Sequence, residues 1–173
     1  MLKHLITKDG ISPLAFPGRA HTVVKATSYE HNESGLTTEL GKEIIAMVDK
    51  RKRKQETIIK ELQKIETVKV YGDKESKTAL VTWGSTVGVV TEIADELGLK
   101  VVQPLYLEPF PCWNIEKALK GVKKIIDIET NSTGQLARLL KCYGFNVNKK
   151  ILRYDGRPFT IDELKKQICQ MTK

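Results

Sequence analysis

Three short polar segments hold most of the residues that could bind a ligand. They are WGSTVG at 83–88, NSTGQLA at 131–137 and YDGRPFT at 154–160. Each follows an apolar stretch and precedes a helical pattern, so each is predicted to join a strand to a helix. Free backbone N–H groups at the start of a helix can hold an anion. The first two segments therefore predict loops that bind an anion or meet a partner, and their candidate residues are Gly84, Ser85, Thr86, Asn131, Thr133, Gly134 and Gln135.

Side chains that could catalyse a reaction are few. Ser85 lies in GSTVG, which lacks the spacing of the serine-hydrolase motif, and no histidine follows it. The same segment has neither the lysine of a P-loop nor the third glycine of a dinucleotide site. Asp127 and Glu129 alternate on one predicted strand and could form an acid–base pair, but we interpret them as a solvated strand end. No catalytic residue is predicted.

The histidines and cysteines do not predict a metal site. All three histidines precede residue 42, and YEHNE at 29–33 is interpreted as a hydrogen-bonded turn rather than a ligand set. Cys112, Cys142 and Cys169 are far apart and form no Cys-x-x-Cys pair. This spacing argues against zinc, or an iron–sulfur cluster held by this chain alone. Scattered cysteines in odd number are typical of a reducing cytoplasm, where we expect the protein to work.

The net charge of +8 is concentrated in one basic run, KRKRK at 50–54. Such a run could suit nucleic acid, but it lies within a helical pattern and no aromatic residue is interleaved to stack on bases. We therefore expect a solvated helix face or a surface for an acidic protein, and no nucleic acid. The sequence has no apolar run near the roughly 20 residues of a membrane span, and its first residues lack the order of a signal peptide.

The elements that position the polar segments follow an irregular stretch. Residues 1–42 are rich in turn formers and weak in periodicity, and a long helix is predicted over 40–65. Together they make up the first predicted part of the chain, residues 1–66, which carries the basic run. An α/β domain is predicted over 67–173, because apolar strands and helices alternate there.

The alternation predicts three layers, with a mostly parallel sheet between helices. Strands are expected at 68–71, 78–83, 100–105, 124–129 and 151–154, and helices at 86–97, 114–120, 133–143 and 161–171. Helix starts are marked by SxxQ at 132–135 and TxxE at 160–163, and helix ends by Gly98, Gly121 and Gly144. The buried central strands are expected to contain Leu80, Val81, Val101, Val102, Ile125 and Ile126.

Seven motifs occur in register along nearly the whole chain. They are GISPLAFPG at 10–18, ATSYEHNESGLTTE at 26–39, MVDKRKRK at 47–54, WGSTVG at 83–88, PFP at 109–111, ETNSTGQLARLL at 129–140 and YDGRPFT at 154–160. This series resembles the C-terminal half of the alpha subunit of 2-oxoacid:ferredoxin oxidoreductases, most closely the 2-oxoglutarate enzymes. The resemblance implies a domain similar to the C-terminal domain of transketolase, in which a five-stranded mixed sheet with one antiparallel edge strand lies between helix layers.

The family resemblance also implies an enzyme complex. In that family, alpha and beta subunits bind thiamine diphosphate and Mg²⁺ between them. The enzyme decarboxylates a 2-oxoacid, passes electrons through iron–sulfur centres to ferredoxin and transfers the acyl group to coenzyme A. The diphosphate site lies on the beta subunit, and the alpha subunit contributes through a pyrimidine-binding domain with a Tyr-Pro-Ile-Thr-Pro-like motif, which this sequence lacks.

The resemblance therefore implies an assembly domain that binds none of these cofactors and is inactive alone. An exposed apolar surface is expected on it, where the beta subunit or other subunits dock or where the chain self-associates. The alternative hypothesis is a stand-alone module that binds either proteins through its basic surface or an anion.

Overall fold

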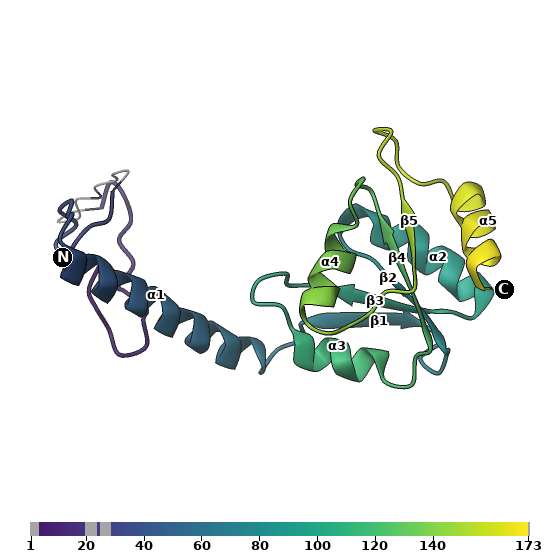
Figure 1. The fold of residues 1–173 in the computed structure, drawn as a ribbon, viewed down its shortest axis with the longest axis horizontal. Helices are drawn as coiled ribbons and strands as arrows, with labels where there is room; N and C mark the ends of the chain where they lie inside the picture. Colours follow the sequence, from purple (N-terminus) through teal and green to yellow (C-terminus); the bar gives the residue numbers. More distant parts are fainter. Residues whose placement is uncertain (1–3, 20–23, 25–28, 173) are drawn as a thin grey trace. The chain divides into compact units, whose positions relative to one another are not determined.

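The computed structural model describes residues 4–19, 24 and 29–172, and the chain divides into two compact units, residues 1–65 and residues 66–173. Residues 26–28, which begin the second of the seven motifs, lie outside the described residues. Among its described residues the first unit contains one helix, α1 (Gly41–Leu62), and the second unit contains the sheet and the other described helices (Figure 1).

A mixed sheet of five strands forms the centre of the second unit (Figure 1). The strands are β1 (Val68–Gly72), β2 (Thr78–Val81), β3 (Lys100–Pro104), β4 (Lys124–Glu129) and β5 (Lys149–Leu152), in the spatial order β1-β3-β2-β4-β5. Strand β1 pairs antiparallel with β3, whereas the pairs β2–β3, β2–β4 and β4–β5 are parallel. The mostly parallel sheet with an antiparallel edge strand is confirmed.

Helices cover both faces of this sheet, which confirms the three-layer prediction. They are α2 (Val87–Leu97), preceded by the short 3₁₀ helix η1 (Gly84–Thr86), α3 (Cys112–Leu119), α4 (Gln135–Cys142) and α5 (Ile161–Thr172). Ile93 of α2 and Leu164 of α5 lie in one buried cluster, with Leu80 from the sheet. Ile115 of α3 and Leu140 of α4 lie in a second cluster, with Ala79 and Val81 from the sheet. Side chains alternate between the faces along a strand, so the central strands are apolar on both.

The predicted core is confirmed at all but one position. Leu80, Val81, Val101, Val102 and Ile126 are buried. Ile125 is only half-buried, because it is the second residue of β4 and lies at the margin of the second cluster rather than within it.

The predicted boundaries differ from the observed ones in two informative places. Strand β5 spans Lys149–Leu152 rather than 151–154, so Arg153 and Tyr154 belong to the loop after the strand. The SxxQ cap at 132–135 is wrong: α4 starts at Gln135, and its N-cap residue is Gly134, whose φ is 65°. Gly98 does end α2 in the left-handed conformation, with a φ of 62°, as the sequence predicts.

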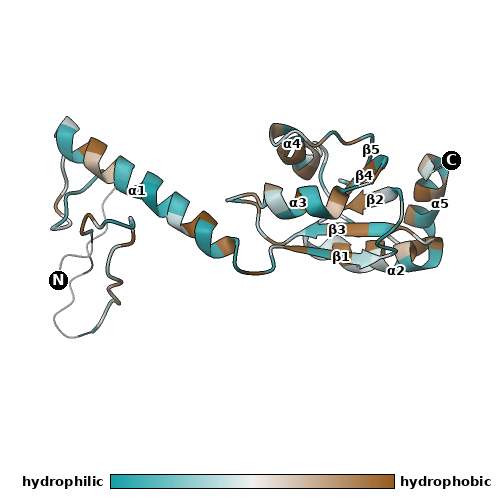
Figure 2. Ribbon diagram, turned by 90° about the horizontal axis from the view of Figure 1, so that it is seen from below, coloured by the Kyte–Doolittle hydropathy of each residue, from teal (hydrophilic) through white to brown (hydrophobic). Residues whose placement is uncertain are grey.

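In the first unit, part of the basic run bonds to the chain's own backbone. The Lys50 ammonium, on a residue that is only 9% exposed, donates to the His4 carbonyl at 3.3 Å. Arg53 donates to the Thr7 carbonyl at 3.3 Å, and the Thr57 hydroxyl donates to the Asp9 carbonyl at 2.8 Å. Figure 2 shows hydrophilic residues through the middle turns of α1 and hydrophobic residues on either side. The expected fully solvated helix face is therefore wrong for Lys50 and Arg53, which hold the preceding segment along the helix.

The segment at 29–33 forms a local turn, as predicted. The Asn32 side-chain carbonyl accepts the N–H groups of Ser34 and Leu36, each at 3.1 Å, and His31 pairs with Thr37 in an isolated β-bridge. Within the described ranges, no helix is both long enough and apolar enough to cross a membrane.

Gly72 offers a direct test of the contact between the end of β1 and its neighbour. Its φ is 68°, and a Cβ there would lie 2.2 Å from the Leu99 carbonyl oxygen. Gly98 has a similar φ of 62°, but a Cβ there would meet nothing within 4 Å. We expect Gly72→Ala to lower the Tm by about 5 °C or more beyond Gly98→Ala, because overpacking of roughly 1–3 kcal/mol adds to the shared backbone strain. Thermal unfolding followed by circular dichroism measures both variants, and equal losses would contradict the predicted contact.

Candidate functional site

The candidate site lies at the edge of the sheet where the parallel strands end. Strands β2, β4 and β5 run in the same direction, so the loops that follow them meet at one edge. These loops are the polar segments at 83–86, 130–134 and 153–160. In open α/β sheets, ligands bind preferentially at this edge.

Two open hollows lie between these loops. The larger has a volume of about 750 Å³, and Ser85, Asn131, Tyr154 and Arg157 are among the residues that line it. The smaller has a volume of about 340 Å³, and its lining residues are Trp83, Gly84, Ser85, Thr86, Thr130, Asn131 and Gln135. Ser85, Thr86, Thr130 and Asn131 line both, so the hollows share one wall.

The structure brings together most of the residues that were predicted to form the site. The smaller hollow is lined by Gly84, Ser85, Thr86, Asn131 and Gln135. Thr133 and Gly134 line neither hollow; their N–H groups donate to the Asn131 side-chain carbonyl at 3.0 and 2.7 Å and so turn the loop. Whether these loops bind a ligand stays a prediction.

A buried carboxylate, Glu129, joins the first two loops. It is only 1% exposed. One of its oxygens accepts the backbone N–H groups of Leu136 and Ala137, at 2.9 and 3.3 Å, and thereby caps α4. The other accepts the Trp83 indole N–H at 3.0 Å and the Asn131 amide at 2.7 Å. Glu129 thus replaces the predicted Ser132 cap, and a carboxylate at a helix N-terminus also complements the helix dipole.

Asp127, two residues earlier on β4, is completely buried beside Glu129. Burial, reinforced by the negative charge of Glu129, raises the pKa of Asp127 to about 9. Burial also opposes ionisation of Glu129, but hydrogen bonds from the Leu136 N–H, Trp83 and Asn131 lower the pKa of Glu129 overall. At neutral pH, Asp127 therefore keeps its proton while Glu129 carries the charge.

These two carboxyl groups do not form the solvated strand end that the sequence suggested. That interpretation is wrong because β4 is a central strand with helices over both faces. Neither Asp127 nor Glu129 lines a hollow, so neither is placed to exchange a proton with a ligand bound there. Their geometry fits a structural role.

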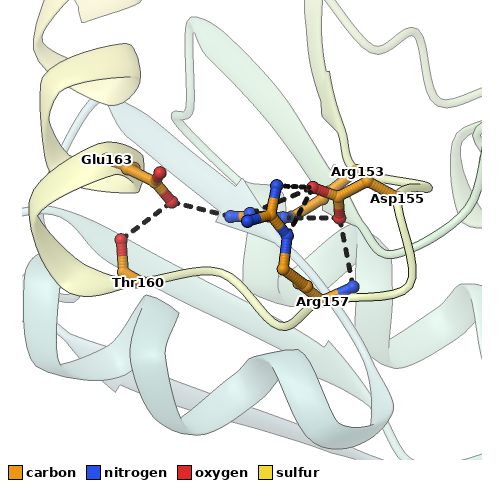
Figure 3. Close-up of polar contacts among 5 residues, drawn as sticks. All are labelled: Arg153, Asp155, Arg157, Thr160 and Glu163. Carbon is orange, nitrogen blue, oxygen red and sulfur yellow. Dashed lines mark hydrogen bonds and ion pairs between the residues drawn. The ribbon is translucent and has the colours of Figure 1, made fainter.

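An ion-pair network fixes the third loop (Figure 3). Arg153 donates to Asp155 at 2.9 Å and to Glu163 of α5 at 2.7 Å, while Arg157 donates to the same Asp155 at 2.9 Å. Hydrogen bonds from Arg153 hold the pKa of Asp155 and of Glu163 below the usual range. Thr160 and Glu163, the predicted TxxE pair, bond through their side chains at 2.9 Å. The loop is thereby tied to the first turn of α5.

Sequence reasoning missed two arginines, a tyrosine and the structural role of a buried glutamate at this edge. Arg153, Tyr154 and Arg157 line the larger hollow but were not among the predicted site residues. Their signal was present, because YDGRPFT was already predicted to be a third loop after a strand. Glu129 was also recognisable in principle, since a carboxylate in a central strand has to be buried and needs donors.

Comparisons with known proteins give one consistent family. No family model matches the chain. The chain is 38% identical to "2-oxoacid:ferredoxin oxidoreductase 1, subunit alpha" of Sulfurisphaera tokodaii, over 96% of this chain and 27% of that protein. It is also 38% identical to the 2-oxoacid:ferredoxin oxidoreductase alpha subunit of Saccharolobus solfataricus, over 94% of this chain and 26% of that protein. The chain thus spans about a quarter of the length of the curated relatives it matches.

A solved structure agrees with these matches. It is the 2-oxoglutarate:ferredoxin oxidoreductase from Magnetococcus marinus with 2-oxoglutarate, coenzyme A and succinyl-CoA bound. The TM-score is 0.78 at 28% sequence identity, and the likeness covers 98% of this chain and 30% of that chain. The fold described above therefore recurs within a larger enzyme chain.

Glu129→Gln tests the buried cap of α4. An amide keeps one acceptor but places an NH₂ group against donors, so we expect a loss of about 1–3 kcal/mol in the free energy of unfolding. Urea denaturation measures this loss. Glu92→Gln is the matched control, since Glu92 is exposed on α2, and it should change stability by less than about 0.5 kcal/mol. Similar effects of both substitutions would show that Glu129 does not hold the loops.

Asp127→Asn tests the proton on Asp127. The pKa of Asp127 is raised from 3.8 to about 9 in the folded protein, so between these values the folded state binds more protons than the unfolded state. The stability that this proton contributes is full below about pH 4 and is lost as the pH rises through 9. We expect Asp127→Asn to gain Tm relative to wild type as the pH rises from 5 to 9, because an amide cannot ionise. A constant Tm difference over this range would mean that Asp127 is already ionised when folded.

Proposed function

Because this chain is homologous to the C-terminal part of the alpha subunits of 2-oxoacid:ferredoxin oxidoreductases, we propose that it is an assembly domain of such an enzyme. The complete enzyme is proposed to depend on thiamine diphosphate and to decarboxylate a 2-oxoacid, forming acyl-CoA, CO₂ and reduced ferredoxin in the cytoplasm. 2-Oxoglutarate is the proposed substrate, and its support is the likeness to the M. marinus enzyme that holds 2-oxoglutarate and succinyl-CoA.

One observation carries the assembly role: the first unit buries little of its own apolar surface. Among its described residues, the buried apolar side chains are Met47 and Leu62. Large apolar residues that stay exposed include Leu14 at 72%, Leu40 at 65% and Ile45 at 63%. Exposed apolar surface of this kind marks sites of protein contact. We propose that the rest of the alpha subunit, the beta subunit or another subunit covers it, and that the isolated chain could self-associate there.

The second unit is proposed to present its strand-end loops to a partner or an anion. The proposed contact residues are Gly84, Ser85, Thr86, Asn131, Thr133, Gly134 and Gln135. Glu129 and the Arg153–Asp155 pair hold these loops and the neighbouring one in place. A rigid set of loops suits docking, because little conformational entropy is lost when a partner binds.

The described residues do not fit the cofactors of the proposed enzyme. Nowhere in the described ranges do three or more His, Cys, Asp or Glu side chains gather in a way that could hold a metal ion. The pair of Asp127 and Glu129 is buried and Asp127 is protonated at neutral pH, so the pair cannot offer two carboxylates to Mg²⁺. We therefore propose that thiamine diphosphate, Mg²⁺, the iron–sulfur cluster and coenzyme A are bound by other parts of the complex, and that this chain alone is inactive.

Reconstitution tests this proposal. The chain is mixed with the N-terminal part of the alpha subunit and with the beta subunit, and 2-oxoglutarate-dependent reduction of a viologen dye is followed in the presence of coenzyme A. We expect turnover from the complete mixture and none from the chain alone, because a site shared between subunits needs all of its surfaces. Turnover by the chain alone would contradict the proposed inactivity, and a silent complete mixture would contradict the assembly role.

A pair of variants on α1 makes this test specific to the exposed apolar surface. Ile45→Gln removes an apolar side chain that is 63% exposed, and Lys52→Gln removes a charge that is 73% exposed on the same helix. We expect Ile45→Gln to raise the concentration of this chain that gives half-maximal turnover by about tenfold, which is the effect of losing one well-buried interface contact. Lys52→Gln should change that concentration little.

A further inference from the structure

We propose that the hollows at the start of η1 and α2 bind the phosphate group of a small phosphate ester. This inference builds on the proposed ligand-facing role of the loops and adds a chemical class to it. Three independent features converge there: a helix start without a side-chain cap, a threonine hydroxyl without a hydrogen-bond partner, and arginine side chains on a wall that contains no acidic residue.

The helical run that begins at Gly84 has no side-chain cap. No side chain bonds to the start of η1 or of α2. The Val87 N–H donates to the Gly84 carbonyl, whereas the Ser85 N–H has no acceptor among the residues that the structure describes. At the same edge, α4 is capped by Glu129. The start of η1 and α2 therefore keeps its donors and its partial positive charge for a ligand.

Thr86 is the second feature. Only 5% of this residue is exposed, and it lines both hollows. Its hydroxyl makes no hydrogen bond within the described part of the chain, and its oxygen is not among the enclosed ones, so it is available to a ligand in the hollows. A phosphate oxygen held at the helix start would accept the Thr86 hydroxyl together with the backbone N–H groups.

The charge on the wall is the third feature. Arg153 and Arg157 line the larger hollow, and none of the residues that line the two hollows is acidic. Arg153 is fixed by Asp155 and Glu163, whereas Arg157 is 75% exposed and is paired with Asp155 (Figure 3). Arg157 can therefore turn toward an anion while Arg153 keeps Asp155 in place. Guanidinium groups bind phosphate with two parallel hydrogen bonds.

The volume of the larger hollow indicates more than a free phosphate ion. About 750 Å³ is within the range of small-molecule sites, and the wall beyond the arginines includes Val89, Tyr154 and Phe159. An apolar and aromatic wall suits the organic part of an ester. Tyr154, which is 73% exposed, offers an aromatic face to it.

Titration of the full chain by two-dimensional ¹H–¹⁵N NMR tests the site, with inorganic phosphate and adenosine monophosphate as probes at constant ionic strength. We expect saturable shifts at the amides of Ser85 and Thr86, with the ester binding more tightly than the free ion. Thr86→Val should weaken binding about tenfold, since a hydrogen bond to a charged group is lost without a change in shape. Arg157→Gln should weaken it by a similar factor, whereas Arg138→Gln, a matched charge removal on the exposed face of α4, should leave it within about twofold.

Three results would overturn the proposal: shifts that do not saturate, shifts confined to the lysines and arginines of α1, or unchanged affinity in a folded Thr86→Val protein. Equal affinity for the ester and the free ion would overturn the assignment to esters and leave a phosphate-ion site. The titration and the reconstitution experiment can succeed or fail independently of each other. Reconstituted turnover without phosphate binding would assign the loops to subunit contact, and saturable phosphate binding without reconstitution would support the site alone.

Discussion

The carboxylate of Glu129 organises the edge of the sheet on which the candidate site stands. A buried negative charge is tolerated only where donors surround it, and here the Trp83 indole, the Asn131 amide and two N–H groups of α4 do so. These donors come from three parts of the edge, so satisfying the charge also places the loop after β2, the loop after β4 and the first turn of α4. The neighbouring Asp127 completes the arrangement by remaining protonated. The position of the loops thus follows from a charge that no ligand can reach.

Different forces stabilise the inside of each unit. In the second unit, apolar helices cover both faces of an apolar sheet, and the hydrophobic effect dominates. In the first unit, hydrogen bonds from Lys50, Arg53 and Thr57 to backbone carbonyls hold the segment along α1. Lys50 and Arg53 keep their charge in these bonds, because a backbone carbonyl is neutral, but a partner would meet mainly the exposed side chains of Arg51, Lys52 and Lys54.

Much of the second unit could be predicted from local patterns, because strands and helices with one or two apolar faces have a clear period in the sequence. The antiparallel edge strand came from the family resemblance, and the order of the strands was not predicted, since many orders satisfy the same alternation. Local reasoning failed where a distant residue decides the outcome. Ser132 has the composition of a helix cap, but Glu129 occupies that place from the strand before the loop. Five of the predicted site residues line the smaller hollow because they lie at helix starts or in a loop after a parallel strand, whereas Arg153 and Arg157 reach the larger one from the loop after β5.

The outermost position of β5 affects whether a strand of another molecule can add to this sheet. A bare strand edge invites another strand to continue the sheet, and proteins prevent this by placing charge on the edge. Strand β5 carries two adjacent, exposed lysines, Lys149 and Lys150, within its four residues. Sheet extension at this end would bring their ammonium groups against an incoming chain, so two copies meeting there would repel one another. Growth of a continuous intermolecular sheet, the route to fibrils, is thereby opposed at β5.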